Sequence, residues 1–151
     1  MTFRRTTPLL DVHQTADEMR RLSCSYCSDL GPWLKVPFYD FYVHVCELPY
    51  IDDPVDVETV SRPAFTLQYD YAPRDCDDKS VLLASWMVGN GEAVRFVASS
   101  TRPDKMLHHV FVQLKNGLYV DATYRKNKDY FGFYPYFPKI THIEALTGFF
   151  K

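Results

Sequence analysis

Three residues whose side chains together support nucleophilic catalysis occur in the order cysteine, histidine, aspartate. Cys76 lies at the start of an expected helix, His109 in an expected strand, and Asp121 in the strand that follows. A thiol attacks a carbonyl carbon when an imidazole accepts its proton and a carboxylate orients that imidazole. A helix N-terminus stabilises a thiolate, so we expect the pKa of Cys76 to be lowered. The pattern predicts a thiol-dependent acyl-transfer site.

The acidic residues around the cysteine act in two directions. Asp75, Asp77 and Asp78 lie in the first turn, where negative charge stabilises the helix. The same charges oppose a thiolate nearby. We interpret all three as capping and dipole-compensating residues.

An acyl-transfer site also needs donors for the oxyanion of the tetrahedral intermediate. The backbone N–H of Cys76 would be one donor. Gln68 is the first candidate for the second donor, with Tyr69 and Tyr71 as alternatives.

Two adjacent histidines, His108 and His109, compete for the role of base, and strand register chooses between them. A two-residue turn at residues 116–117 would place Asp121 on the same face as His108. That register would also scatter the apolar side chains over both faces of the hairpin.

A three-residue loop at residues 115–117, with Gly117 in the left-handed conformation, pairs Leu114 with Leu118 instead. The apolar side chains of both strands then share one face, and burial of that face fixes the register. His109 and Asp121 lie together on the opposite face. His109 is therefore the predicted base.

The elements that must position these residues divide the chain into a helical half and a sheet. After residues 89–91 the spacing of apolar residues changes from 3.6 to 2, so we expect an α+β fold with a small antiparallel sheet. We expect a single domain over residues 1–151. The expected helices cover about residues 16–29, begin near Pro37 and Pro63, and cover about residues 76–88.

Aromatic residues are concentrated in residues 130–137, after the predicted triad. We interpret this segment as a loop that closes the core, with a wall of the substrate cleft or a docking surface as the alternative. Residues 139–146 are expected to return as a final strand.

Composition excludes several classes of function. A net charge of −2 and a pI near 6.2 provide no basic surface for nucleic acid or an anionic membrane. No apolar run has the length of a membrane span, and the first ten residues lack the apolar core of a signal peptide. We therefore expect a cytoplasmic protein with reduced cysteines.

Several segments of the chain resemble the transglutaminase-like superfamily: residues 74–86, 93–98, 109–112 and 120–123. The resemblance spans about residues 36–124 and includes residues 38–54, which are similar to the stretch before the family's nucleophile. It implies a papain-like fold in which N-terminal helices precede a nucleophile helix packed on an antiparallel sheet. The family's catalytic triad falls on Cys76, His109 and Asp121. Arg74 stands where the family often has glycine, and Ala122 where it usually has proline.

The resemblance implies acyl transfer from a peptide or protein substrate, at a glutamine or other amide side chain or at a peptide bond. Family members include cross-linking acyltransferases, peptidases, amidases and inactive binding domains. We favour hydrolysis slightly, because nothing in the chain indicates a second site for an amine. The reaction requires no metal and no organic cofactor.

Two other interpretations remain. Small stand-alone members resembling this chain occur among tailed-phage structural genes, so the protein could be a non-catalytic virion component with virion protein partners. Alternatively, Cys24, Cys27, Cys46 and a histidine could bind zinc, although the lone CxxC pair lacks a matching second half. We expect no zinc.

Overall fold

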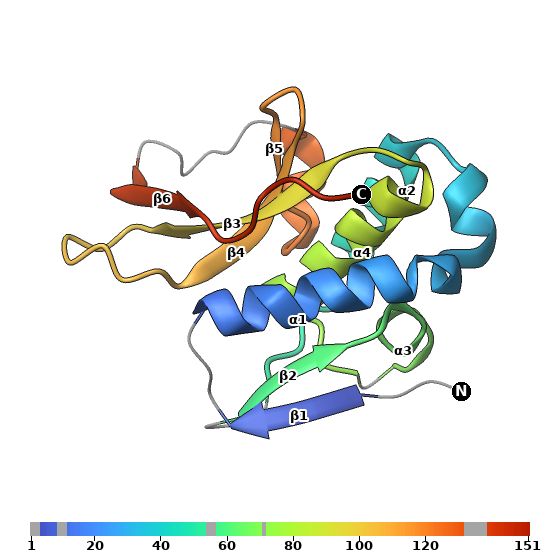
Figure 1. The fold of residues 1–151 in the computed structure, drawn as a ribbon, viewed down its shortest axis with the longest axis horizontal. Helices are drawn as coiled ribbons and strands as arrows, with labels where there is room; N and C mark the ends of the chain where they lie inside the picture. Colours follow the sequence, from blue (N-terminus) through green and yellow to red (C-terminus); the bar gives the residue numbers. More distant parts are fainter. Residues whose placement is uncertain (1–3, 9–11, 54–56, 71, 132–138) are drawn as a thin grey trace.

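The computed structural model describes residues 4–8, 12–53, 57–70, 72–131 and 139–151, and these combine helices with antiparallel strands, which confirms the α+β class (Figure 1). The elements, in chain order, are β1 (Arg4–Pro8), α1 (Val12–Ser25), the 3-10 helix η1 (Cys27–Lys35), α2 (Phe38–Glu47), β2 (Val57–Ser61), α3 (Pro63–Gln68), α4 (Cys76–Gly89), β3 (Val94–Ser100), β4 (His109–Leu114), β5 (Tyr119–Val120), the 3-10 helix η2 (Arg125–Tyr130) and β6 (His142–Ala145).

Helix α4 lies between the main sheet and the other helices (Figure 1). The sheet is antiparallel, with strand order β5-β4-β3-β6, and α4 packs on β3 and β4. Leu82 and Leu83 of α4 are fully buried with Phe96 of β3 and Val112 of β4. The central position of α4 is reflected in its burial, since nearly every residue from Asp77 to Met87 is buried.

The first predicted helix is only partly correct. Helix α1 begins at Val12 and ends at Ser25, and the chain then continues as η1. Within η1, Gly31 has a φ of +56° and Pro32 follows it, so a regular α-helix cannot continue there. Met19 and Leu22 of α1 are fully buried, as the helical spacing of apolar residues predicts.

The predicted hairpin register is confirmed. Val112 pairs with Val120, and the Leu114 backbone N–H donates to the Leu118 carbonyl at 2.9 Å. Gly117 has a φ of +94°, the left-handed conformation that the three-residue loop requires. His109 thus lies on the same hairpin face as Asp121, to which it is hydrogen-bonded.

A second, two-stranded sheet was not predicted. Strands β1 and β2 pair antiparallel and lie on the side of α1 away from the main sheet (Figure 1). Residues 4–8 contain no apolar alternation, so periodicity provided no strand signal. The predicted final strand is confirmed as β6, which pairs with β3, whereas residues 132–138 of the aromatic segment lie outside the described residues.

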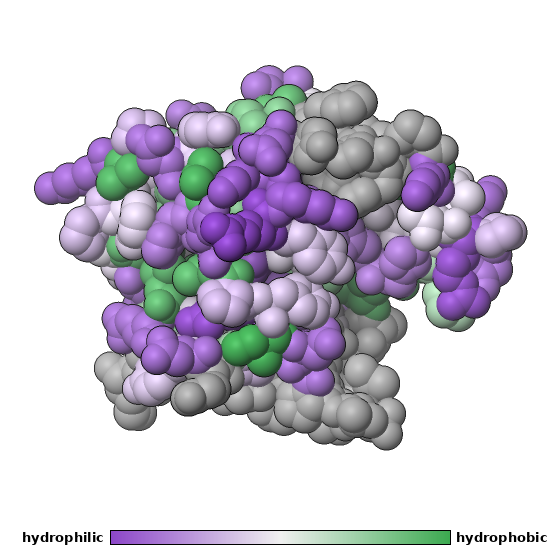
Figure 2. Space-filling model, turned by 180° about the vertical axis from the view of Figure 1, so that it is seen from behind, coloured by the Kyte–Doolittle hydropathy of each residue, from purple (hydrophilic) through white to green (hydrophobic). Residues whose placement is uncertain are grey.

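The surface opposite the view of Figure 1 carries small, separate hydrophobic patches among hydrophilic residues (Figure 2). None of the helices in the described part of the chain combines the length and the apolar character that a membrane span requires.

Candidate active site

Cys76 is the first residue of α4 and follows a complete helix cap. The Asp75 carboxylate accepts hydrogen bonds from the backbone N–H groups of Asp77 at 3.1 Å and Asp78 at 3.2 Å. In return, the Asp78 carboxylate accepts from the Asp75 N–H at 3.3 Å. This capping box fixes where the helix begins and therefore where the thiol lies. The interpretation of Asp75 and Asp78 as capping residues is confirmed.

The imidazole and the carboxylate form a buried pair. His109 begins β4, and its Nε2 is hydrogen-bonded to Oδ2 of Asp121, which is 2% exposed. The other oxygen of Asp121 accepts from Thr123, through the backbone N–H at 2.8 Å and the hydroxyl at 2.5 Å. Burial lowers the pKa of His109, but the charge and hydrogen bond of Asp121 outweigh it, so the pKa is raised.

Cys76 and His109 lie on the wall of the same cavity. This cavity has a volume of about 230 Å³, and Tyr50, Thr123 and Tyr124 also line it. A neighbouring cavity of about 390 Å³ has Cys76 and His109 on its wall as well. The structure thus brings two of the predicted triad residues to one solvent-accessible space, with Asp121 hydrogen-bonded to His109 behind it.

The thiol and the imidazole are not hydrogen-bonded to each other in the described residues. The Cys76 sulfur contacts the Asp77 carboxylate at 3.9 Å. Since Asp121 occupies Nε2 of His109, Nδ1 is the nitrogen left to accept a proton from the thiol. The thiol and Nδ1 of His109 must come within hydrogen-bond distance of each other before that transfer.

The expectation that the helix N-terminus lowers the pKa of Cys76 is wrong. Burial raises the pKa of the thiol well above its ordinary value, and the carboxylates of Asp77 and Asp75 raise it further. The backbone hydrogen bond from Val110 opposes these effects without overcoming them. The thiol is therefore protonated at neutral pH, and any nucleophilic attack must be accompanied by proton transfer to His109.

His108 is not hydrogen-bonded to the Asp121 carboxylate in the described residues. Its Nε2 accepts a hydrogen bond from the Thr101 backbone N–H at 3.0 Å, and its ring lines the same cavity as His109. The choice of His109 over His108 as the partner of Asp121 therefore agrees with the geometry.

The predicted oxyanion donor does not lie at the cavity. Gln68 ends α3, is exposed, and lines a separate pocket with Trp33 and His44. Tyr69 is stacked on Phe65 and does not line either cavity at Cys76, and Tyr71 lies outside the described residues. The prediction of Gln68 as the second oxyanion donor therefore does not agree with the geometry, since α3 places its amide at a different pocket.

Tyr50 is a polar residue at the cavity to which the sequence analysis assigned no role. Its ring is 41% exposed, stacks on Tyr124 at 5.4 Å between centroids, and lines both cavities beside Cys76. Its pKa is raised by burial and by a hydrogen bond to Asp52, so the hydroxyl keeps its proton, which it donates to Asp52. The residue lies in the loop after α2, where no periodic pattern singles it out.

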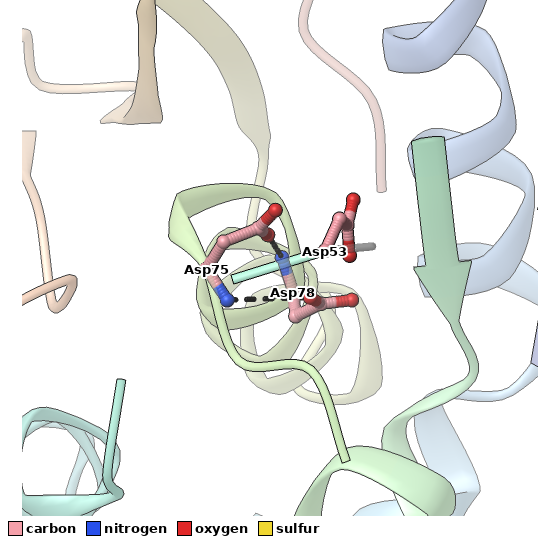
Figure 3. A group of neighbouring side chains, drawn as sticks. All are labelled: Asp53, Asp75 and Asp78. Carbon is pink, nitrogen blue, oxygen red and sulfur yellow. Dashed lines mark hydrogen bonds between the residues drawn. The ribbon is translucent and has the colours of Figure 1, made fainter. Parts of the chain in front are cut away.

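One group of side chains offers oxygen ligands for a cation. Oxygen atoms of Asp53, Asp75 and Asp78 lie within 4.8 Å of one another at the N-terminus of α4 (Figure 3). Asp75 and Asp78 already serve the helix cap. Burial and the neighbouring carboxylates raise the pKa of Asp78 well above its ordinary value, so a protonated Asp78 accounts for the close approach.

All four cysteines are free thiols. Cys24 and Cys27 lie around the end of α1, whereas Cys46 is buried in the core from α2. No group of potential metal ligands in the described residues contains a cysteine.

Comparisons of the chain with protein-family models, with curated proteins and with solved structures find no match. The residues at the cavity and their geometry must therefore support any functional inference by themselves.

Proposed function

We propose that the protein is a thiol-dependent acyl-transfer enzyme in which Cys76 is the nucleophile, His109 the general base and Asp121 the residue that orients the base. One observation supports this assignment most strongly. Cys76 and His109 line one cavity, and Nε2 of His109 is hydrogen-bonded to the buried carboxylate of Asp121. This is the relation that triad chemistry needs, and the hairpin register produces it.

In the proposed mechanism the resting thiol is neutral. As the Cys76 sulfur attacks the carbonyl carbon of an amide, Nδ1 of His109 accepts the thiol proton and Asp121 stabilises the imidazolium. The backbone N–H of Cys76 donates to the oxyanion, and the Tyr50 hydroxyl becomes the second donor when it exchanges its hydrogen bond to Asp52 for one to the oxyanion. The tetrahedral intermediate collapses to a thioester, and the leaving nitrogen takes the proton from His109. Water, deprotonated by His109, then releases the acid and the thiol.

The walls of the smaller cavity favour an uncharged acyl group. Among the described residues, its lining contains cysteine, tyrosine, serine, threonine, histidine and isoleucine side chains but no carboxylate, lysine or arginine. An amide side chain of a peptide, such as glutamine, suits these walls better than a charged side chain does. We propose a peptide or protein substrate with this amide, hydrolysed or transferred to an amine.

The proposed relationship to the transglutaminase-like superfamily, and with it the papain-like fold, rests on the order of the elements. A helix that begins with the nucleophile precedes antiparallel strands that carry the histidine and the aspartate. The sequence resemblance covers about residues 36–124, which include all three residues.

A second candidate function is favoured by one observation, the raised pKa of Cys76 together with the lack of a hydrogen bond to His109 among the described residues. A protein that keeps the fold as a structural or interaction module, for example in a virion, would tolerate an unreactive thiol.

The deciding experiment is incubation of the wild-type protein with glutamine-containing peptides and a primary amine, followed by mass spectrometry of peptides and protein. Loss of ammonia, peptide cleavage or amine addition would each identify a different acyl transfer. We expect Cys76→Ala to abolish the product and Cys24→Ala, at an exposed thiol outside the cavity, to retain it. A folded wild-type protein that forms no product and no thioester between about pH 6 and 9 would support the non-catalytic module instead.

A further inference from the structure

Lys79 is a buried cation one turn along α4 from Cys76. The residue is 1% exposed, and its Nζ donates to the carbonyl of Leu48 at 2.7 Å and to the carbonyl of Thr123 at 2.9 Å. No carboxylate in the described part of the chain lies within ion-pair distance of Nζ. Burying an ammonium group without a paired carboxylate is costly, so its hydrogen bonds must fix a particular backbone arrangement.

The backbone that Lys79 holds is the turn that carries the triad carboxylate. Thr123, whose carbonyl accepts from Lys79, donates both its N–H and its hydroxyl to Asp121. The other oxygen of Asp121 bonds to His109. A continuous set of hydrogen bonds therefore runs from the nucleophile helix, through Lys79 and Thr123, to the imidazole.

We propose that Lys79 is a positioning residue that holds the turn at residues 121–123 against α4 and thereby sets the orientation of His109 relative to Cys76. The catalytic consequence rests on the proposed function, whereas the physical link from Lys79 to the imidazole does not. Because Lys79 and Cys76 belong to the same helix, any shift of α4 would move the thiol and the carboxylate turn together. The relative geometry of the triad is preserved in this way.

The alternative is that Lys79 acts only on overall stability or only through its charge. The titratable groups that act electrostatically on Lys79 include Cys46, Asp121, Arg74 and Glu47. A charge effect and a positioning effect on His109 have opposite signs. Loss of a nearby positive charge would raise the pKa of His109, whereas loss of the Asp121 hydrogen bond would lower it.

The test is an NMR pH titration of the His109 ring in the wild type, in Lys79→Met and in the control Lys126→Met, which removes an exposed lysine from η2. Methionine retains the length and apolar stem of lysine but donates no hydrogen bond. We expect the pKa of His109 to fall in Lys79→Met and to stay at the wild-type value in Lys126→Met. Lys79→Arg, which keeps the donors, should bring the value back towards that of the wild type.

An unchanged or raised pKa of His109 in a folded Lys79→Met protein would overturn the proposal, even if the melting temperature falls. If Lys79→Met does not fold, Lys79→Gln takes its place, because its shorter, uncharged side chain cannot donate to both carbonyls as Nζ does. We expect the pKa of His109 to fall in Lys79→Gln as well, and an unchanged or raised pKa would overturn the proposal.

Turnover supplies a separate readout that depends on the proposed function. We expect kcat of Lys79→Met to fall by about tenfold or more with KM little changed, because a displaced base impairs the chemical step rather than binding. If the wild type has no activity while Lys79→Met still lowers the pKa of His109, the proposed function fails and the positioning role stands.

Discussion

Replacing Asp121 by asparagine should reverse the protonation pattern of His109. The carboxylate oxygen next to Thr123 accepts two hydrogen bonds, so the asparagine oxygen must stay there to satisfy both donors. Its NH₂ group then faces Nε2 of His109. Nε2 can accept that hydrogen bond only if the imidazole proton moves to Nδ1, which is the nitrogen that must receive the thiol proton. The variant is nearly isosteric, yet it carries the wrong tautomer.

The expected loss in kcat is about 10⁴-fold, the size that the same substitution causes in a serine protease triad. It corresponds to about 5.5 kcal/mol of transition-state stabilisation. The assay is turnover of the peptide substrate, with the His109 ring followed by NMR to verify the tautomer. Thr123→Val removes the hydroxyl donor to Asp121 but leaves the backbone N–H donor and the carboxylate, so its kcat should fall far less. A loss below tenfold in Asp121→Asn would refute the triad assignment.

The same variant has a pH signature in stability. Because Asp121 raises the pKa of His109 in the folded state, the protonated imidazole contributes stability that is fully present below about pH 6.5. That contribution disappears as the pH rises through the folded-state pKa of His109. Urea titrations should therefore show the wild type losing stability relative to Asp121→Asn over this range. Parallel curves would contradict the pKa shift.

Four further predictions concern the thiol, the helix cap, the hairpin and Tyr50. The alkylation rate of Cys76 should keep rising with pH beyond about 8.5, because burial, Asp77 and Asp75 raise the pKa of the thiol, and a plateau below that pH would contradict this. Asp75→Ala should lower the free energy of unfolding by about 1 to 2 kcal/mol, as measured by urea denaturation. Asp78→Asn, which mimics a protonated carboxyl, should lower it by less. Gly117→Ala should cost about 1 to 2 kcal/mol from its positive φ alone, since a methyl group there meets no atom. Tyr50→Phe should lower kcat about tenfold or more with KM unchanged, and an unchanged kcat would remove Tyr50 from the oxyanion site.

The parts of the fold that sequence predicted are those in which local chemistry and burial agree. Helix α4 has a capping box at its start and glycines at its end, so its bounds followed from the sequence almost residue by residue. The hairpin register was predictable because a slip of one residue would have exposed Val112 and Val120, and Gly117 supplied the loop. His109 and Asp121 could be paired for the same reason.

The remaining features depend on contacts between distant segments. Strand β1 is stabilised by pairing with β2, which lies some fifty residues later in the chain, and its own composition carries no strand signal. Tyr50 lines the cavity from a loop, whereas Gln68 lies at the end of α3 and lines a different pocket. The role of Lys79 depends on two carbonyls contributed by other elements. Pattern reasoning within one segment has no access to such partners.

The pKa of Cys76 shows how the surroundings of a helix N-terminus can outweigh its dipole. The dipole and the free N–H groups act on the thiol over a few ångströms, but the carboxylates of Asp75 and Asp77 occupy that same space and the cap uses the N–H groups. A thiol in this setting does not form a stable ion pair with His109 at rest. Its reactivity must instead depend on the fraction of neutral His109, which increases with pH because Asp121 raises the imidazole pKa. If the enzyme is active, kcat/KM should therefore rise through the pKa of His109, as general-base catalysis requires, and should not follow ionisation of the thiol.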